Sequence, residues 1–181
     1  SYNIRKLTNS SETTNTLNVG SSTAPIPTVE FGNFTNGNVS EIILYSKALN
    51  TVQKIITDNY LSAKYGLILQ NNDFYTQDNG GIDFDHKVAG IGRATDGSLH
   101  IDSQGTGIIR INTPSDLNND EFLFWGEDVK EASYEFSPSS ASDYTDRLDT
   151  KWRVSKRNDL GTVTVSVEAS DLTLNSVDGC N

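Results

Sequence analysis

The chain has 181 residues and a formal net charge of −10, with 24 acidic and 14 basic side chains. This length suits one domain or two small ones. A nucleic-acid surface needs clustered Lys and Arg to neutralise phosphate, so the acidic balance argues against nucleic acid as a partner. No apolar run approaches the roughly 20 residues of a membrane helix, and we expect a protein that does not span a membrane.

The early part of the chain predicts short strands. Asn, Ser and Thr are common throughout, and these residues favour turns and strand edges over helix interiors. Residues 2–7 and 13–19 have strand character, and Asn36-Gly37 is a strong hairpin signal. Residues 39–45 carry a short β-branched apolar run, which predicts a buried strand.

One segment predicts a helix at about residues 51–65. Asn50 is a good N-cap residue, and Gln53 completes the pattern of a capping box. Gly66 stands where a left-handed residue commonly ends a helix. Apolar residues recur at three- and four-residue spacing and form one face, which consists of Val52, Ile55, Ile56, Tyr60 and Ala63.

Beyond this helix, the composition changes and strand signals then return. Residues 70–83 are rich in Asn, Asp, Gly and Gln, which is typical of a linker or a long loop. Strand patterns follow at the spacing of a β-sandwich, at residues 87–92, 99–103, 107–112, 121–125, 134–136, 151–155 and 162–168. In the last of these, Val163, Val165 and Val167 alternate with polar residues and predict one buried face.

Two stretches of sequence resemble known bacterial modules. The run NVSEIILYSKALN at residues 38–50, followed by YLSAKYG at residues 60–66, resembles the end of a laminin-G-like, concanavalin-A-type lectin domain. The later pieces VAGIGR (88–93), EFLFWG (121–126) and LDTKWRV (148–154) resemble a β domain of unknown function that often follows it. The resemblance covers most of residues 37–168.

The resemblance implies a fold that is mainly β, with antiparallel, jelly-roll-like sandwich units and one prominent helix. We expect residues 1–70 to be the C-terminal portion of a lectin-like sandwich with its closing helix, and residues 71–181 to be a second sandwich-like domain. A complete lectin-like sandwich needs well over a hundred residues. We therefore expect the chain to be part of a much longer protein.

Few residues suggest catalysis, and we expect a non-enzymatic protein without a catalytic residue. The only histidines are His86 and His100. Asp85 beside His86 could support a general base, but no nucleophile motif accompanies the pair, and a surface His beside Asp is usually just solvated. Cys180 has no matching histidine context.

Two acidic loops raise the question of calcium. Residues 116–120 read D-x-N-x-D, the opening of an oxygen-ligand loop, but Glu121 replaces the usual glycine, and a tight polar turn is the favoured interpretation. A second set surrounds the glycines after residue 70 and consists of Asp73, Asp78, Asp83 and Asp85. We assign no residue as a metal ligand and expect no cofactor, with Ca²⁺ as the alternative.

Sugar binding would need aromatic rings beside polar groups. Trp125 and Trp152 lie inside apolar strand patterns and are expected to be core residues, whereas Tyr75 in the loop is a freer candidate.

In the families that it resembles, such a chain is a non-enzymatic module of a large secreted or cell-surface bacterial protein. The resemblance implies adhesion or gliding motility, export through a dedicated outer-membrane route such as type IX secretion, and an extracellular location. Its expected partners are polysaccharide and other domains of the same chain. The alternatives are an accessory carbohydrate-binding module of a polysaccharide-degrading enzyme and a structural spacer.

Overall fold

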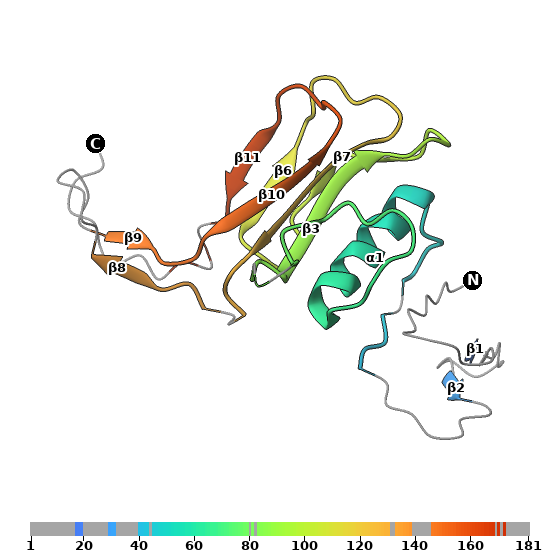
Figure 1. The fold of residues 1–181 in the computed structure, drawn as a ribbon, viewed down its shortest axis with the longest axis horizontal. Coiled ribbons are helices and arrows are strands. Elements are labelled where there is room, and N and C mark those ends of the chain that lie inside the picture. The colour runs from blue at the N-terminus through green and yellow to red at the C-terminus, as the bar shows by residue number, and fades with distance from the viewer. Residues whose placement is uncertain are drawn as a thin grey trace. The chain divides into compact units, whose positions relative to one another are not determined.

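The computed structural model describes residues 17–19, 29–31, 40–43, 45–79, 81, 83–130, 133–138, 146–168, 170 and 172. The chain divides into two units, Ser1–Leu49 and Asn50–Asn181, and each is treated by itself below. Within the described residues the fold is mainly β, every pair of strands is antiparallel, and there is a single helix (Figure 1). These residues confirm the expected mainly β fold, with antiparallel sheets and one helix.

The first unit contains one small pair of strands. Strand β1 (Leu17–Val19) pairs with β2 (Val29–Phe31). Residues 40–43 and 45–49 form neither helix nor strand, and Ile42 is 46% exposed. The predicted buried strand at 39–45 is wrong for these residues, because a strand needs a pairing partner and no described strand pairs with them. The strand at 2–7 and the hairpin at Asn36-Gly37 lie outside the described residues.

Helix α1 (Thr51–Tyr65) begins and ends where the local signals predict. The Asn50 side chain accepts a hydrogen bond from the Gln53 amide at 2.9 Å, and the Gln53 side chain accepts one from the Asn50 amide at 3.1 Å. Gly66 closes the helix in the left-handed conformation, with φ of 61°. Since both ends are fixed by adjacent residues, the helix follows directly from the sequence.

The second unit contains two larger sheets and one small pair of strands. The four-stranded sheet has the order β10 (Trp152–Arg157), β7 (Glu121–Glu127), β3 (His86–Arg93), β4 (Leu99–His100). The three-stranded sheet has the order β11 (Thr164–Val167), β6 (Ile109–Asn112), β5 (Asp102–Ser103). Strands β8 (Phe136–Pro138) and β9 (Asp146–Leu148) pair separately.

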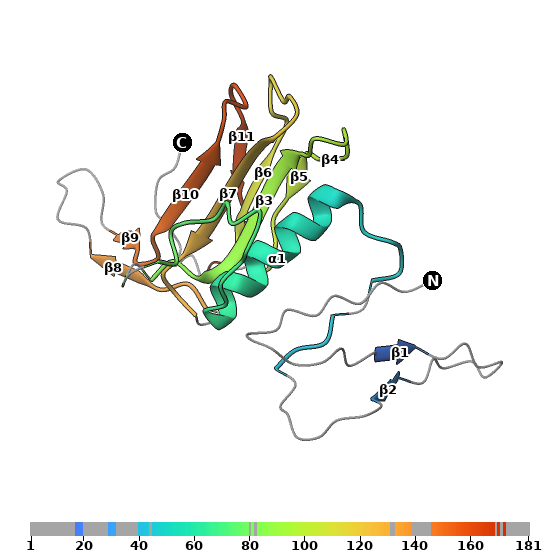
Figure 2. The same cartoon turned by 45° about the vertical axis from the view of Figure 1, so that its right-hand side comes forward.

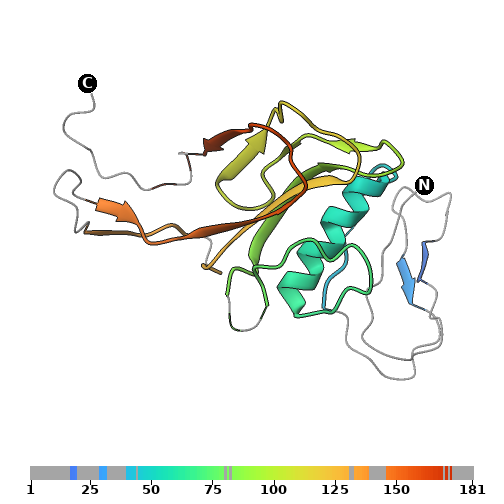
Figure 3. The same cartoon turned by 45° about the horizontal axis from the view of Figure 1, so that its top comes forward.

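Helix α1 covers one face of the four-stranded sheet, and the three-stranded sheet lies against the other face (Figures 2 and 3). The side chains of β7 alternate between the two interfaces. Phe122 and Phe124 pack in the cluster with the helix, whereas Leu123 and Trp125 pack with Ile111 of β6. All seven residues of β7 are buried because both faces of this strand are covered.

The two glycines of the VAGIGR sequence in β3 lie against aromatic rings of β7. A Cβ on Gly90 would lie 2.8 Å from Cδ1 of Phe124. A Cβ on Gly92 would overlap the Phe122 ring and lie 2.7 Å from the Glu121 carbonyl oxygen. Because no side chain fits at either position, the glycines make room for the aromatic rings between sheet and helix.

The division of the chain differs from the expected boundary near residue 70. Helix α1 shares its apolar cluster with β3 and β7, so it belongs to the core of the second unit and does not close a unit of residues 1–70. The loop after the helix is no linker either, since Phe74 and Tyr75 pack into the same cluster. The polar composition of the loop gave no indication that these two aromatic side chains are part of the core.

Strand β11 forms at the expected place, but its expected buried face is largely exposed. Val165 and Val167 are 57% and 51% exposed, while Val163 is partly buried against the core. The alternation places the valines on one face of the sheet, since Val165 and Val167 lie opposite Ile111 and Ile109 of β6. The strand lies at the margin of its sheet, however, and no described residue covers the valines there.

Candidate functional site

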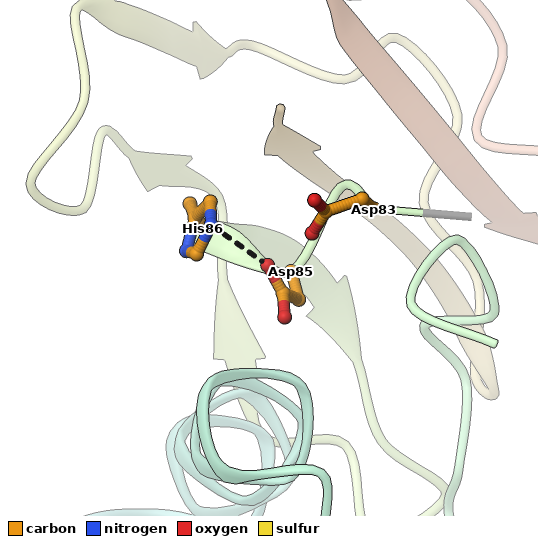
Figure 4. Close-up of side chains that lie close together, drawn as sticks. All are labelled: Asp83, Asp85 and His86. Atoms are coloured by element: carbon orange, nitrogen blue, oxygen red, sulfur yellow. Dashed lines mark ion pairs between the residues drawn. The ribbon is translucent and has the colours of Figure 1, made fainter. Parts of the chain in front are cut away.

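Three potential ligand groups gather where the loop after α1 enters β3. Asp83 and Asp85 end the loop, and His86 begins the strand. One ligand atom from each lies within 4.8 Å of the others, and the side chains of Asp85 and His86 point toward each other (Figure 4). The distance from Nε2 of His86 to Oδ1 of Asp85 is 3.1 Å. Among the described residues, no other group of this kind comes together.

The carboxylates of this loop influence one another. Burial raises the pKa of Asp85, His86 lowers it and Asp83 raises it. Burial also raises the pKa of Asp78, with further contributions from Asp73 and Asp85. Oδ1 of Asp78 is buried and accepts no hydrogen bond from the described residues. The loop therefore concentrates negative charge that the described residues neutralise only in part.

A buried asparagine of the helix holds the loop in place. The Asn59 side chain donates to the carbonyl oxygens of Ile55 and Asn72 and accepts from the amides of Phe74 and Tyr75, at 2.8 to 2.9 Å. Tyr75 is only 1% exposed, and its hydroxyl donates to the Phe84 carbonyl oxygen. The expectation that Tyr75 is a free aromatic in the loop is wrong, because its ring is a core residue.

The ligand set of Asp83, Asp85 and His86 fits some cations better than others. Calcium takes six to eight oxygen ligands, and these residues supply few oxygens and one nitrogen. Zinc accepts nitrogen and carboxylate oxygen from three protein ligands and a water molecule. Exposed acidic groups are common without an ion, however, so the cluster alone does not define a metal centre.

The two histidines differ in their surroundings. No described hydroxyl or thiol group forms a hydrogen bond with His86, so the pair of Asp85 and His86 does not extend to a nucleophile there. Burial lowers the pKa of His100, and Asp102 partly offsets this effect. Cys180 lies outside the described residues.

The loop at 116–120 adopts a hydrogen-bonded turn. Arg157 donates to both carboxylate oxygens of Asp120, at 2.9 and 2.5 Å. The Asn118 side chain donates to Asp116, and its backbone amide donates to Glu121. These contacts occupy carboxylate oxygens that calcium would need, and they favour the turn interpretation.

Among the described residues, the most deeply buried charged side chain is that of Glu127, at the end of β7. Glu127 is 1% exposed, and Nζ of Lys87 lies 2.5 Å from its Oε1. The Tyr134 hydroxyl donates to both carboxylate oxygens at 3.2 and 3.1 Å, and Nε1 of Trp152 donates to Oε2 at 2.9 Å. The rings of Tyr134 and Trp152 stack with centroids 6.3 Å apart.

This network joins β3, β7, β10 and residue 134, four parts that are far apart in sequence. Burial lowers the pKa of Lys87, but hydrogen bonds to Glu127 and Tyr134 and attraction to Glu127 outweigh this effect and leave the pKa raised. Lys87 has φ of 49°, beside the irregular pairing between His86 and Ala89. The sequence offers only a weak signal for this network, namely that Glu127 directly follows an apolar run.

Trp125 is a core residue, as expected, whereas Trp152 is only partly buried and lies outside both apolar clusters. Trp125 is 2% exposed, and its Nε1 donates to the Ile109 carbonyl oxygen at 3.3 Å. Trp152 is half-buried in the network around Glu127. Neither ring resembles the open aromatic platform on which a sugar would stack.

The chain belongs to a family described as "Domain of unknown function (DUF8202)", which matches residues 51–179. The match begins at the first residue of α1, and the second structural unit begins at Asn50. No curated protein and no solved structure matches the chain. No helix in the described part has the length and apolar character needed to cross a membrane.

Proposed function

We propose that this chain is a non-enzymatic part of a larger secreted or cell-surface bacterial protein that serves adhesion. The observation that carries this proposal is the agreement of two boundaries. The family match starts at residue 51, and the structural unit with its own core starts at Asn50. A family domain preceded by a separate unit is the organisation of a modular protein.

The mechanism that we propose is geometric. Helix α1 and two sheets enclose two apolar clusters, and the network around Glu127 links strands across the larger sheet. Such a module holds its shape and spaces the parts of the protein on either side of it. Many weak contacts made by repeated or neighbouring modules then add through multivalency.

The accessory carbohydrate-binding role receives less support. A sugar site of the stacking type needs an accessible ring, and Trp125, Trp152 and Tyr75 are all engaged internally. The net charge of −10 also disfavours anionic polysaccharides as direct ligands. We therefore assign the module the role of spacing, with adhesion residing in the parent protein.

A domain exchange in the parent protein tests this role. Residues 50–181 are replaced by an unrelated β domain of similar length, and attachment of cells to a surface is measured beside a deletion without replacement. Spacing predicts that the exchanged protein retains attachment and that the deletion loses it. Loss of attachment after the exchange, with equal protein at the cell surface, would contradict the proposal.

A further inference from the structure

Among the described strands, β11 is an edge of its sheet that lacks the usual protections against pairing with another chain. The described part of the two larger sheets has four edge strands: β10, β4, β11 and β5. Strand β10 carries three cationic side chains (Arg153, Lys156 and Arg157), and β4 and β5 have only two residues each. Charge and shortness are the usual protections against pairing with other chains. Strand β11 has four residues, Thr-Val-Ser-Val, and no charge.

The backbone of β11 presents hydrogen-bonding groups at this edge. The Glu168 amide donates to the Ile108 carbonyl oxygen at 2.8 Å, in register with the ladder between β11 and β6. Since N–H and C=O groups alternate in direction along an antiparallel strand, Ser166 faces β6 and Val165 and Val167 face away. No described strand pairs with the outward groups of these two valines.

The side chains give a second, independent indication. Val165 and Val167 are 57% and 51% exposed, although they lie on the face of the sheet that carries Ile109 and Ile111. β-Branched residues stabilise strand pairing through contacts with neighbours across the strands. Two exposed valines thus accompany a row of backbone groups with which no described strand pairs.

We propose that a second copy of this chain pairs its β11 with this edge, antiparallel about a two-fold axis at Ser166. Ser166 then faces its own copy, and Val165 of each chain faces Val167 of the other. The outward groups of the valines form four hydrogen bonds, and the three-stranded sheet continues into six strands. This inference goes beyond the proposed function and does not depend on it.

Local charge permits this pairing at β11 and disfavours the same pairing at β10. No like charges meet in the β11 pairing, because Thr164 faces Glu168 of the other copy. Pairing of β10 with itself would bring together strands that each carry Arg153, Lys156 and Arg157. Like charges on facing strands are destabilising, so the same pairing is disfavoured at β10.

Sedimentation of the full chain tests the association. One strand gives a small interface, so we expect a weak dimer that forms between about 10 µM and about 1 mM. The average mass should rise from 19.8 kDa toward twice this value over that range. A chain that stays monomeric at every concentration overturns the proposal.

Disulfide trapping tests the register. In a Cys180→Ser background, Ser166→Cys places two thiols on the axis, where the Cα atoms are about 4.5 Å apart and a disulfide can form. The matched control Thr164→Cys places them about 13 Å apart, beyond disulfide reach. We expect a cross-linked dimer from Ser166→Cys alone. Equal cross-linking of both variants, or none with Ser166→Cys, overturns the register.

Charge substitutions at Ser166 distinguish a loss of pairing between two copies from a general loss of structure. Ser166→Lys and Ser166→Glu should each weaken self-association about fivefold, because like charges then meet on the axis. An equimolar mixture of the two should restore association. Ile101→Lys changes the charge at a residue between β4 and β5 that is 48% exposed, and it should leave self-association unchanged. A mixture that stays as weak as its components contradicts the proposal.

Discussion

Asn59 gives the sharpest test of how the loop is fixed to the helix. Its side chain is 1% exposed and makes four hydrogen bonds within the protein. Asn59→Ala removes them and leaves the amides of Phe74 and Tyr75 without an acceptor. A lost hydrogen bond costs about 1 kcal/mol, and a buried unsatisfied donor costs about 1–3 kcal/mol. Because the Phe74 amide is only part-buried and water can partly replace its acceptor, we expect a loss of about 3 kcal/mol.

Urea denaturation followed by tryptophan fluorescence measures this loss, since Trp125 lies in the core. The matched control is Asn119→Ala, whose side chain makes one long hydrogen bond of 3.5 Å at the surface and should cost less than about 0.5 kcal/mol. The thermal midpoint of Asn59→Ala should fall by about 10 °C. A loss below about 1 kcal/mol would refute the reasoning, because the loop would then not depend on these bonds.

Three further predictions concern the sheets and the start of the helix. Gly92→Ala should destabilise the chain by at least about 1–3 kcal/mol in chemical denaturation, because its Cβ would overlap the Phe122 ring. A smaller effect would mean that the ring has room to move. Lys87→Met should cost about 3–5 kcal/mol by leaving the Glu127 carboxylate buried without a counter-charge, and adding Glu127→Gln should recover at least half of this in a double-mutant cycle. Additive losses would show that the pair is not coupled. Hydrogen bonds from Thr51 and Ser98 lower the pKa of Asp96 to about 2, so its contribution to stability is present above about pH 4 and is lost as the pH falls toward 2. Asp96→Asn should flatten this part of the stability curve, and an unchanged curve would rule the carboxylate out.

The features that could be predicted from sequence are those fixed by adjacent residues. Helix α1 has the expected bounds because Asn50 and Gly66 act on the backbone beside them. Strands β3 and β7 were also predicted, because β-branched and aromatic runs have few alternatives. Features that depend on which elements meet could not be predicted in this way.

The network around Glu127 illustrates that limit. Lys87 and Glu127 come together only after β3 pairs with β7, and nothing near either residue specifies that pairing. Tyr75 shows the reverse error, since a polar loop composition suggested exposure where the ring is buried. In β11 the alternation places Val165 and Val167 opposite Ile111 and Ile109, but the predicted burial of these valines is wrong, because no described residue covers them.

The central claim, that this module belongs to a larger protein at the cell surface, is tested most directly by proteolysis of intact cells. Peptides released by a protease that does not enter the cells are identified by mass spectrometry, and the parent polypeptide is sized by immunoblotting against the module. The account predicts release of peptides from residues 50–181 and a parent mass far above 19.8 kDa. A polypeptide near 19.8 kDa that is cleaved only after cell lysis would contradict it.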